Sequence, residues 1–209
     1  MKKISKIVIT GGPCSGKTTI IKQLRNQYSN LGYKVVTLSE TATDLIISGI
    51  IGKDPKIGAM PFQQAIMRTQ INKEKIYEEL LKHCEYENII MFCDRGLMDG
   101  KAYVSNSDFE KLLKEFKLTE QDVLNKYDSV IHLESVAKAK PELFGYDTNQ
   151  ARTSTVEQAI IFNDKVYDAW HKHKNFVPIP FEEDFHKKLK KTSFAIDRMV
   201  NTDIERSNI

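Results

Sequence analysis

Nine residues near the start of the chain have the types and spacing of a phosphate-binding loop. They are, in order, Gly11, Gly12, Pro13, Cys14, Ser15, Gly16, Lys17, Thr18 and Thr19. Residues 11–18 fit the pattern G-x-x-x-x-G-K-[ST] and directly follow the apolar run of residues 7–9. Glycine lets the backbone approach a ligand closely, so that N–H groups can surround a phosphate where the next helix begins. The sequence therefore predicts a site for a nucleoside triphosphate, ATP or GTP.

Two side chains of this loop suit the charged end of a triphosphate. Lys17 would place a positive charge beside the β- and γ-phosphates, and the Thr18 hydroxyl would bind Mg²⁺. Cys14 would lie inside the loop, either as a thiol whose alkylation blocks the site or as a small residue that fits the turn. These features predict nucleotide and Mg²⁺ binding, but they do not identify the group that receives the phosphate.

Acidic residues follow three further apolar runs, at the positions where parallel α/β sheets bind ligands; they are Glu40, Asp94 and, after residues 129–133, Glu134. Asp94 follows residues 88–93 and is expected to hold Mg²⁺ directly or through water; the alternative is an ordinary turn residue. Glu40 follows residues 34–38 and either orients an acceptor hydroxyl and takes its proton, or is an exposed loop residue. Asp99 lies a little further along the chain, and its simpler interpretation is a helix cap or a surface carboxylate.

Two arginines are candidates for offsetting charge on a transferring phosphate. Arg95 either neutralises phosphate charge or pairs with a neighbouring carboxylate. Arg152 ends a polar segment and either closes over the triphosphate or is a surface residue near a helix start. The candidate catalytic residues are therefore Lys17, Glu40, Asp94, Arg95 and Arg152.

One further motif matches a guanine-binding signature, but its position in the chain argues against that function. Residues 125–128 read Asn-Lys-Tyr-Asp and match N-K-x-D. That signature follows a strand, whereas these residues precede the apolar run of residues 129–133. We therefore do not assign guanine specificity to them.

Short apolar runs alternate with amphipathic segments, which predicts an α/β fold with a parallel sheet covered by helices on both faces. The expected strands are residues 6–10, 34–38, 88–93, 129–133 and 176–179. One helix follows the loop and stops at Gly32, and further helices are expected over residues 43–48, 61–83, 108–116, 119–126, from 154 onward, and 182–200. A single domain is expected over residues 1–200, with a frayed tail over residues 201–209.

Helical periodicity assigns apolar side chains to buried faces. In the helix of residues 61–83 the expected buried residues are Phe62, Ala65, Ile66, Thr69, Ile76 and Leu80. In the first helix they are Ile20, Ile21, Leu24, Tyr28 and Leu31, and in the helix from 154 they are Val156, Ala159, Ile160, Val166, Tyr167 and Trp170. Capping boxes are expected at Thr119 with Asp122 and at Ser154 with Glu157. Residues 134–152 lack periodicity, which predicts a mobile segment.

The composition is ordinary for a soluble globular protein and argues against nucleic acid or a membrane as partner. The chain has 209 residues, a net charge of +3 and 41% hydrophobic residues. No segment approaches the roughly 20 apolar residues of a membrane span, and the apolar stretch after Lys2 and Lys3 is too short for a signal peptide. Lysine clusters within residues 171–174 and 187–191 are expected on solvated helix faces. Three cysteines without metal spacing favour a reducing, cytoplasmic setting.

Three motifs, in order, resemble one known family. Residues 9–19 resemble the start of the AAA-type domain shared by the nicotinamide-riboside kinase region of bacterial NadR proteins and by the Ttd14 proteins. Cys-Asp-Arg-Gly at residues 93–96, followed by Asp99, Ala102 and Tyr103, is similar to its second motif. The third comprises Arg152 and Thr153 followed by Glu157, Ala159, Trp170 and His173. The resemblance extends to about residue 188.

This resemblance implies a P-loop NTPase fold of the nucleoside- and nucleotide-kinase-like group. The expected architecture is a three-layer α/β/α sandwich whose five parallel strands have the order 2-3-1-4-5, with a lid between strand four and the last helices. The leading functional hypothesis is a kinase that transfers the γ-phosphoryl group of ATP to a small-molecule acceptor such as a nucleoside. The alternative is a nucleotide-dependent switch or adaptor that acts through a protein partner, and an NTPase dependent on nucleic acid is a weaker third.

Overall fold

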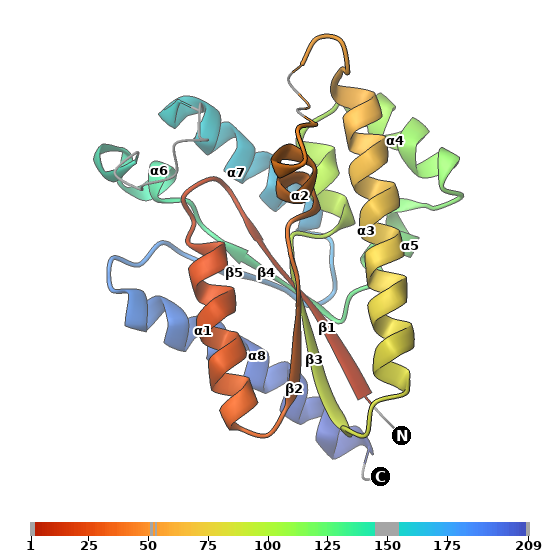
Figure 1. Ribbon diagram of the computed structural model, residues 1–209. Coiled ribbons are helices and arrows are strands. Elements are labelled where there is room, and N and C mark those ends of the chain that lie inside the picture. The colour runs from red at the N-terminus through yellow and green to blue at the C-terminus, as the bar shows by residue number, and fades with distance from the viewer. Residues whose placement is uncertain (1–2, 51, 53, 145–154, 208–209) are drawn as a thin grey trace.

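A five-stranded parallel sheet forms the centre of the protein (Figure 1). The computed structural model describes residues 3–50, 52, 54–144 and 155–207. The strands are β1 (Lys3–Gly11), β2 (Lys34–Leu38), β3 (Asn88–Asp94), β4 (Ser129–Leu133) and β5 (Phe176–Ile179). Their order in the sheet is β2-β3-β1-β4-β5, which confirms the order 2-3-1-4-5 and the α/β fold expected of a P-loop NTPase.

Continuous apolar runs place β1 and β3 at the centre of this sheet. All five residues 89–93 of β3 are buried, as expected for a strand covered on both faces. Ile9 of β1 pairs with Asp94 of β3 on one side and with Ile131 of β4 on the other. The register therefore brings the carboxyl ends of these strands to one edge, where β1 continues into the phosphate loop.

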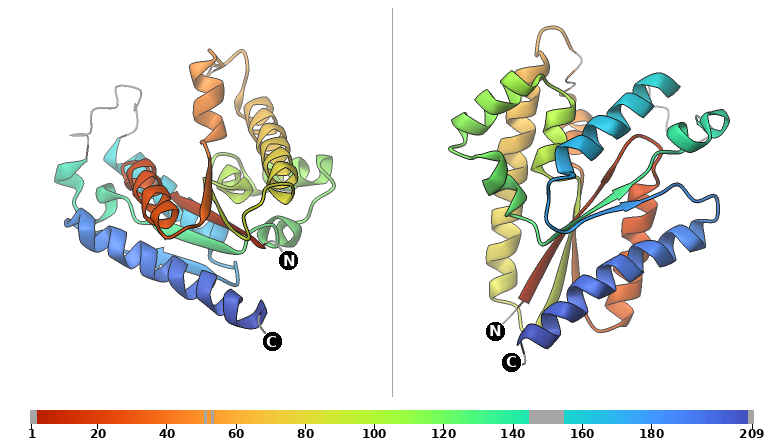
Figure 2. Two further views of the ribbon diagram at one scale, coloured as in Figure 1. Left: turned by 60° about the horizontal axis from the view of Figure 1, so that its bottom comes forward. Right: turned by 180° about the vertical axis from the view of Figure 1, so that it is seen from behind.

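Helices cover both faces of the sheet. Ile7 and Ile9 of β1 pack with α1 (Lys17–Asn30) and α8 (Phe185–Ser207), which lie side by side in Figure 2. Val8 points to the opposite core. The elements of that side are α3 (Ala59–Lys82), η1 (Leu97–Ala102), α4 (Asn106–Glu115), α5 (Glu120–Leu124) and α7 (Val156–Trp170).

Three short elements accompany the carboxyl ends of the strands, toward the top of Figure 1. They are α2 (Thr41–Ile47), α6 (Val136–Ala139) and η2 (Pro141–Leu143). The last two lie within residues 134–152, where a mobile segment outside the core was expected; the structure instead has two short helices there, with Ala137 buried. The beginning of β1 and the end of α8 lie together at the opposite end of the molecule (Figure 1). Among the described residues, no helix is both long and apolar enough to cross a membrane.

The buried face of α3 differs from the face predicted by its apolar residues. The buried residues are Phe62, Gln63, Met67, Gln70, Glu74 and Leu81. Ile76 and Leu80, which were expected inside, are 53% and 65% exposed. The reason is a buried polar network, in which Glu74 pairs with Lys6 at 2.6 Å and accepts a hydrogen bond from the Tyr127 hydroxyl at 2.8 Å. Buried charges must be paired, so this network determines which side of the helix faces inward.

Several helix ends also differ from the sequence-based expectation. Leu31 is 62% exposed because α1 already ends at Asn30. The capping box at Thr119 and Asp122 is confirmed, whereas α7 is capped by Thr155 with Gln158, one residue later than expected. Tyr167 of α7 is exposed rather than buried. At the other end of the chain, α8 continues to Ser207 instead of stopping at residue 200.

Candidate functional site

The backbone between β1 and α1 has the conformation of a tight loop that only glycine can complete at two positions. At Gly11 φ is +142°, and an added Cβ would lie 2.1 Å from the carbonyl oxygen of Leu133. At Gly12 the added Cβ would lie 2.8 Å from the Cβ of Asn163 on α7. Cys14 and Gly16 have φ values of +55° and +78°, so left-handed residues alternate with others before α1 begins. Such alternation turns successive N–H groups toward a common centre and is typical of anion-binding loops.

The Lys17 side chain folds back over this loop. Its Nζ donates to the carbonyl oxygens of Gly11 at 3.1 Å and Gly12 at 2.9 Å, and to Oγ of Ser15 at 3.2 Å. Burial and then the charge of Arg95 lower the pKa of Lys17 to about 8. Lys17 is therefore a partly buried cation whose charge would be stabilised by added negative charge in the loop.

Asp94 ends β3 beside the loop with an oxygen that lacks a partner. Among the described residues, none forms a hydrogen bond to its buried Oδ1. Burial, opposed by the charge of Lys17, raises the pKa of Asp94 to about 6. A buried polar atom without a partner calls for a specific explanation, and a bound cation is one. Thr18 lines the same pocket as Asp94, so the two expected Mg²⁺ ligands are brought together.

Glu40 and Arg95 form an ion pair across the carboxyl ends of β2 and β3. Nε of Arg95 donates to Oε1 of Glu40 at 2.5 Å. Burial alone would raise the pKa of Glu40, but the charges of Arg95 and Lys17 lower it to about 2. The sequence left two interpretations of Arg95 open, phosphate neutralisation and pairing with a carboxylate. In the structure Arg95 pairs with a carboxylate. Glu40 is consequently ionised and fixed in direction.

Asp99 holds the other side of the Arg95 guanidinium. Its Oδ1 accepts from Nη1 of Arg95 at 3.0 Å and from the Thr10 hydroxyl at 2.5 Å. Its Oδ2 accepts from the Gly96 N–H and from Nε1 of Trp170, both at 3.0 Å. Asp99 is 3% exposed, so a surface carboxylate is the wrong interpretation, although the cap contact to Gly96 is present.

The Arg95 backbone adopts a conformation that is unfavourable for a side chain. Its φ is +70°, and its N–H donates to the carbonyl oxygen of Ile9 at 3.1 Å. A non-glycine residue in this region costs roughly 1–3 kcal/mol. The strain persists because Glu40 and Asp99 hold the side chain from two sides, and it aims the guanidinium across the loop, with Nη1 3.3 Å from the Gly11 carbonyl oxygen.

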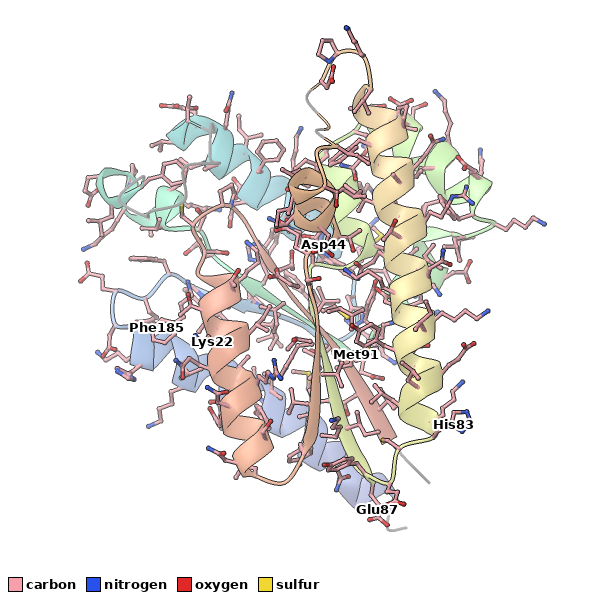
Figure 3. The ribbon with its side chains drawn as sticks, in the orientation of Figure 1. Lys22, Asp44, His83, Glu87, Met91 and Phe185 are labelled. Atoms are coloured by element: carbon pink, nitrogen blue, oxygen red, sulfur yellow. The ribbon has the colours of Figure 1, made fainter. Side chains whose placement is uncertain are left out.

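A pocket of about 360 Å³ opens beside these residues. Its lining combines one end of α1, the end of β2, and α2, and it includes Thr18, Glu40 and Asp94. Lys22 on α1 and Asp44 on α2 also line it and are labelled in Figure 3. Asp44 pairs with Lys73 at 2.7 Å. The pocket thus connects the loop with Glu40, which Arg95 holds, and with Asp94, whose Oδ1 has no hydrogen-bond partner among the described residues.

The comparison with protein families decides the class of this chain. A family model described as an AAA domain matches residues 6–187. The chain belongs to this AAA-domain family. A comparison with proteins of curated function gave no match. The loop, the strand order and the family together make this AAA domain a P-loop protein that binds nucleotide.

Other residues singled out in the sequence lie elsewhere in the AAA domain. Arg152 and Ser154 fall outside the described residues. Asp128, the last residue of the N-K-x-D match, accepts from the Lys6 N–H at 2.7 Å at the amino end of β4, away from the phosphate loop. Glu134 follows β4 and accepts from the Phe181 N–H at 3.0 Å. Neither carboxylate joins the group around Arg95.

Two residues that hold the phosphate loop were missed by sequence reasoning. Oδ1 of Asn163, buried on α7, accepts from the N–H groups of Gly12 at 3.4 Å and Ser135 at 3.0 Å. Lys188, within the cluster expected to be solvated, is only 6% exposed, and its Nζ donates to the carbonyl oxygen of Ser15 at 2.9 Å. Lys188 was hidden among exposed lysines, and the apolar periodicity of α7 gave no signal for Asn163.

Proposed function

We propose that this AAA domain is a phosphotransferase that moves the γ-phosphoryl group of ATP to a hydroxyl of a small molecule. The observation that carries the proposal is the pocket in which the ionised Glu40 and Asp94, whose Oδ1 finds no hydrogen-bond partner in the described part of the chain, meet the Thr18 end of the loop. A protein that only binds nucleotide needs the loop and a cation site. A carboxylate held in place by Arg95 in an adjoining pocket is what an acceptor hydroxyl requires.

The loop supplies the binding of the donor nucleotide. Its N–H groups and the start of α1 favour negative phosphate oxygens. Lys17 would exchange its carbonyl partners for phosphate oxygens, which are stronger acceptors for a buried ammonium group. Gly11 and Gly12 admit no side chain, so the backbone stays accessible.

Thr18 and Asp94 fit a Mg²⁺ ion. Asp94 offers a buried oxygen without a hydrogen-bond partner among the described residues, and the Thr18 hydroxyl lines the same pocket. No group of three or more His, Cys, Asp or Glu side chains in the described part of the chain is placed to hold a metal by itself. This suits Mg²⁺, which usually takes one or two protein ligands together with phosphates and water. Bound there, it would neutralise charge on the phosphates.

Glu40 would receive the acceptor. Its carboxylate accepts a hydrogen bond from the attacking hydroxyl, turns the oxygen lone pair toward the phosphorus, and takes the proton as the new O–P bond forms and the bond to the leaving diphosphate breaks. The low pKa of Glu40, about 2, makes it a weak base. Phosphoryl transfer tolerates this because little proton transfer is needed before bond cleavage in a loose transition state.

The proposal also gives a role to Arg152 and a chemical class to the acceptor. Arg152 would add a positive charge over the triphosphate from the segment that precedes α7. The resemblance to the nicotinamide-riboside kinase region favours a nucleoside as acceptor. ATP is favoured over GTP as donor because the N-K-x-D residues lie at the far end of β4.

A nucleotide-dependent switch is the second candidate. The observation in its favour is that α6 contacts the loop, since the Val136 N–H lies 3.4 Å from the Cys14 carbonyl oxygen. A change at the loop could thereby reach the segment after β4 and be detected by a protein partner. This candidate predicts slow hydrolysis and no acceptor.

Single-turnover transfer distinguishes the two candidates. The protein, ATP labelled at the γ-phosphate and Mg²⁺ are mixed with a panel of nucleosides, and labelled product is measured. A phosphorylated nucleoside supports the kinase, whereas slow release of inorganic phosphate with every acceptor contradicts it. Lys17→Ala should abolish tight ATP binding, and Lys187→Ala, at an exposed position of α8 that does not line the pocket, serves as the matched control.

A further inference from the structure

Three successive carbonyl oxygens of the phosphate loop are held from outside the loop. The Ser135 hydroxyl donates to the carbonyl oxygen of Pro13. The Val136 N–H donates to Cys14 at 3.4 Å, and Nζ of Lys188 donates to Ser15 at 2.9 Å. Two of these donors follow β4 and the third comes from α8, so distant parts of the chain fix one short stretch of backbone.

Holding a carbonyl group also fixes the N–H group of the same peptide. The peptide unit is planar and trans, so its C=O and N–H bonds point in opposite directions. The carbonyl groups of residues 13–15 point toward Ser135, Val136 and Lys188. The N–H groups of residues 14–16 must therefore point away from these three donors, toward the opposite side of the backbone. Three N–H groups in a row are a phosphate-binding arrangement.

Lys188 is an unusual donor for this purpose because it is a buried cation without an anionic partner. Among the described residues no carboxylate lies within ion-pair distance of its Nζ, and its other neighbours are the Glu134 carbonyl oxygen at 3.4 Å and the Phe181 ring, whose centroid lies 5.8 Å away. Burial lowers the pKa of Lys188 to about 8, although the charges of Glu134 and Glu182 oppose this. Unpaired buried charge is costly, so a structural role alone would be served better by a neutral donor.

We propose that Lys188 and Ser135 are positioning residues for the diphosphate part of the bound nucleotide. They orient the peptide groups of residues 13–15 before the ligand arrives, and Lys188 adds positive potential behind the loop. The inference rests on nucleotide binding at the loop but not on phosphoryl transfer, so it can fail or hold independently of the kinase assignment. Preorganisation of this kind increases affinity because less backbone ordering is left for the binding step.

The test compares affinities of the full chain for ATP, ADP and AMP by titration calorimetry. Lys188→Met should weaken ATP and ADP binding about 10- to 100-fold, as expected for the loss of a charged hydrogen bond, and AMP binding less than about 3-fold. Lys188→Arg should recover most of the ADP affinity. Lys187→Met is the matched control, because Lys187 is exposed on the same turn of α8, and it should bind like the unaltered chain.

Ser135→Ala provides the second variant, which removes a single oxygen atom and keeps the charge of Lys188. We expect ADP binding to weaken about 3- to 10-fold, as expected for the loss of a neutral hydrogen bond. In the double variant the two effects should add less than fully, because both residues act on the same peptide groups. Melting temperatures and amide exchange of the ligand-free variants verify that they are folded.

Three results would overturn the inference. The first is unchanged ADP affinity in folded Lys188→Met. The second is a loss for AMP as large as that for ADP, since this would place Lys188 at the base or the ribose. The third is failure of Lys188→Met to fold together with unchanged ADP affinity of Ser135→Ala. If phosphoryl transfer is observed, Lys188→Met should raise KM for ATP and leave kcat within about 3-fold, because the positioning precedes chemistry.

Discussion

Nε of Arg95 and Oε1 of Glu40 lie 2.5 Å apart, although the two residues are 55 positions apart in the chain. This contact joins the ends of β2 and β3 and lowers the pKa of Glu40 far below neutrality. Asp99 holds the same guanidinium from its other side at 3.0 Å. Glu40 is therefore presented to the pocket as a carboxylate with a fixed direction and a constant charge at physiological pH.

Replacement of Glu40 by glutamine should separate binding from chemistry. We expect Glu40→Gln to reduce single-turnover phosphoryl transfer by about 10²- to 10⁴-fold, because the amide oxygen can still accept a hydrogen bond from the hydroxyl but cannot take its proton, while ATP affinity changes by less than about 3-fold. Transfer to the best acceptor and ATP titration measure the two quantities. Glu110→Gln, an exposed change on α4 outside the pocket, is the control and should retain transfer. Equal losses of binding and transfer would instead place Glu40 in contact with the nucleotide.

Asp94→Asn should stabilise the ligand-free protein above pH 6. Because burial raises the pKa of Asp94 to about 6, folding favours its protonated form, and this contribution to stability is lost as pH rises from about 4 to about 6. Asparagine has no such dependence. The variant should therefore be more stable by about 1–2 kcal/mol at pH 7.5, after allowance for partial exposure, and similar below pH 4.

Urea unfolding without Mg²⁺ or nucleotide at several pH values measures this difference. In the same variant, Mg²⁺ should no longer strengthen ATP binding, since the proposed ligand is gone. If Asp94→Asn is less stable than the unaltered chain at pH 7.5, the carboxylate has a partner that the contacts described above do not include, and the proposed Mg²⁺ site must be revised.

Asp99→Asn should destabilise the fold and be visible in the fluorescence of Trp170. Asp99 accepts four hydrogen bonds, and an amide has only one oxygen with which to accept them, while Arg95 would keep a buried charge. Removing one partner of a buried ion pair costs about 3–5 kcal/mol. Trp170 is the only tryptophan of the chain and donates to Asp99, so its emission reports both the local change and urea unfolding. Asp168→Asn, an exposed change two residues before Trp170, should leave stability unaltered.

The folding stability of the protein should fall at acidic pH because His132 in β4 becomes protonated. Burial lowers the pKa of His132 to about 4, from 6.5 in an exposed histidine, with Nε2 3.3 Å from the Asn163 carbonyl oxygen. Folding thus favours neutral His132, so its contribution is complete above pH 6.5 and is lost as pH falls toward 4, by about 3 kcal/mol in total.

The comparison of His132→Phe with the unaltered chain isolates this contribution. The phenylalanine can pack against Tyr167 and Phe176, the two aromatic neighbours of His132, and does not titrate. Urea unfolding between pH 4 and 7 should show a shallower acid loss for the variant, whereas His171→Asn, at an exposed site, should follow the unaltered chain. Parallel pH curves for all three proteins would contradict the assignment.

Much of the fold was predictable because its signals are local. Three of the five strands, β2, β4 and β5, have the predicted bounds, and the glycine loop and strand-end acids pointed to the correct edge of the sheet. Parallel strands must have their carboxyl ends together, so Glu40 and Asp94 could be placed near the loop without knowing any distance.

The rest depends on contacts between residues distant in the chain. The inward side of α3 is set by the pairing of Glu74 with Lys6, and hydrophobic periodicity gives the wrong face for a helix that buries ions. In the sequence Lys188 resembles a surface lysine among several others. Only the folded structure shows that it contacts the phosphate loop. The choice of Arg95 between phosphate and carboxylate likewise needed the position of Glu40.

The outside contacts of the phosphate loop have a consequence for how the protein is made. Ser15 and its partner Lys188 are separated by 173 residues. The ribosome therefore synthesises the loop long before it synthesises Lys188. At roughly 5–20 residues per second, a ribosome needs on the order of 10–35 seconds to bridge that interval. Throughout it, the nascent chain carries a complete nucleotide-binding motif that lacks the lysine which holds its backbone in place.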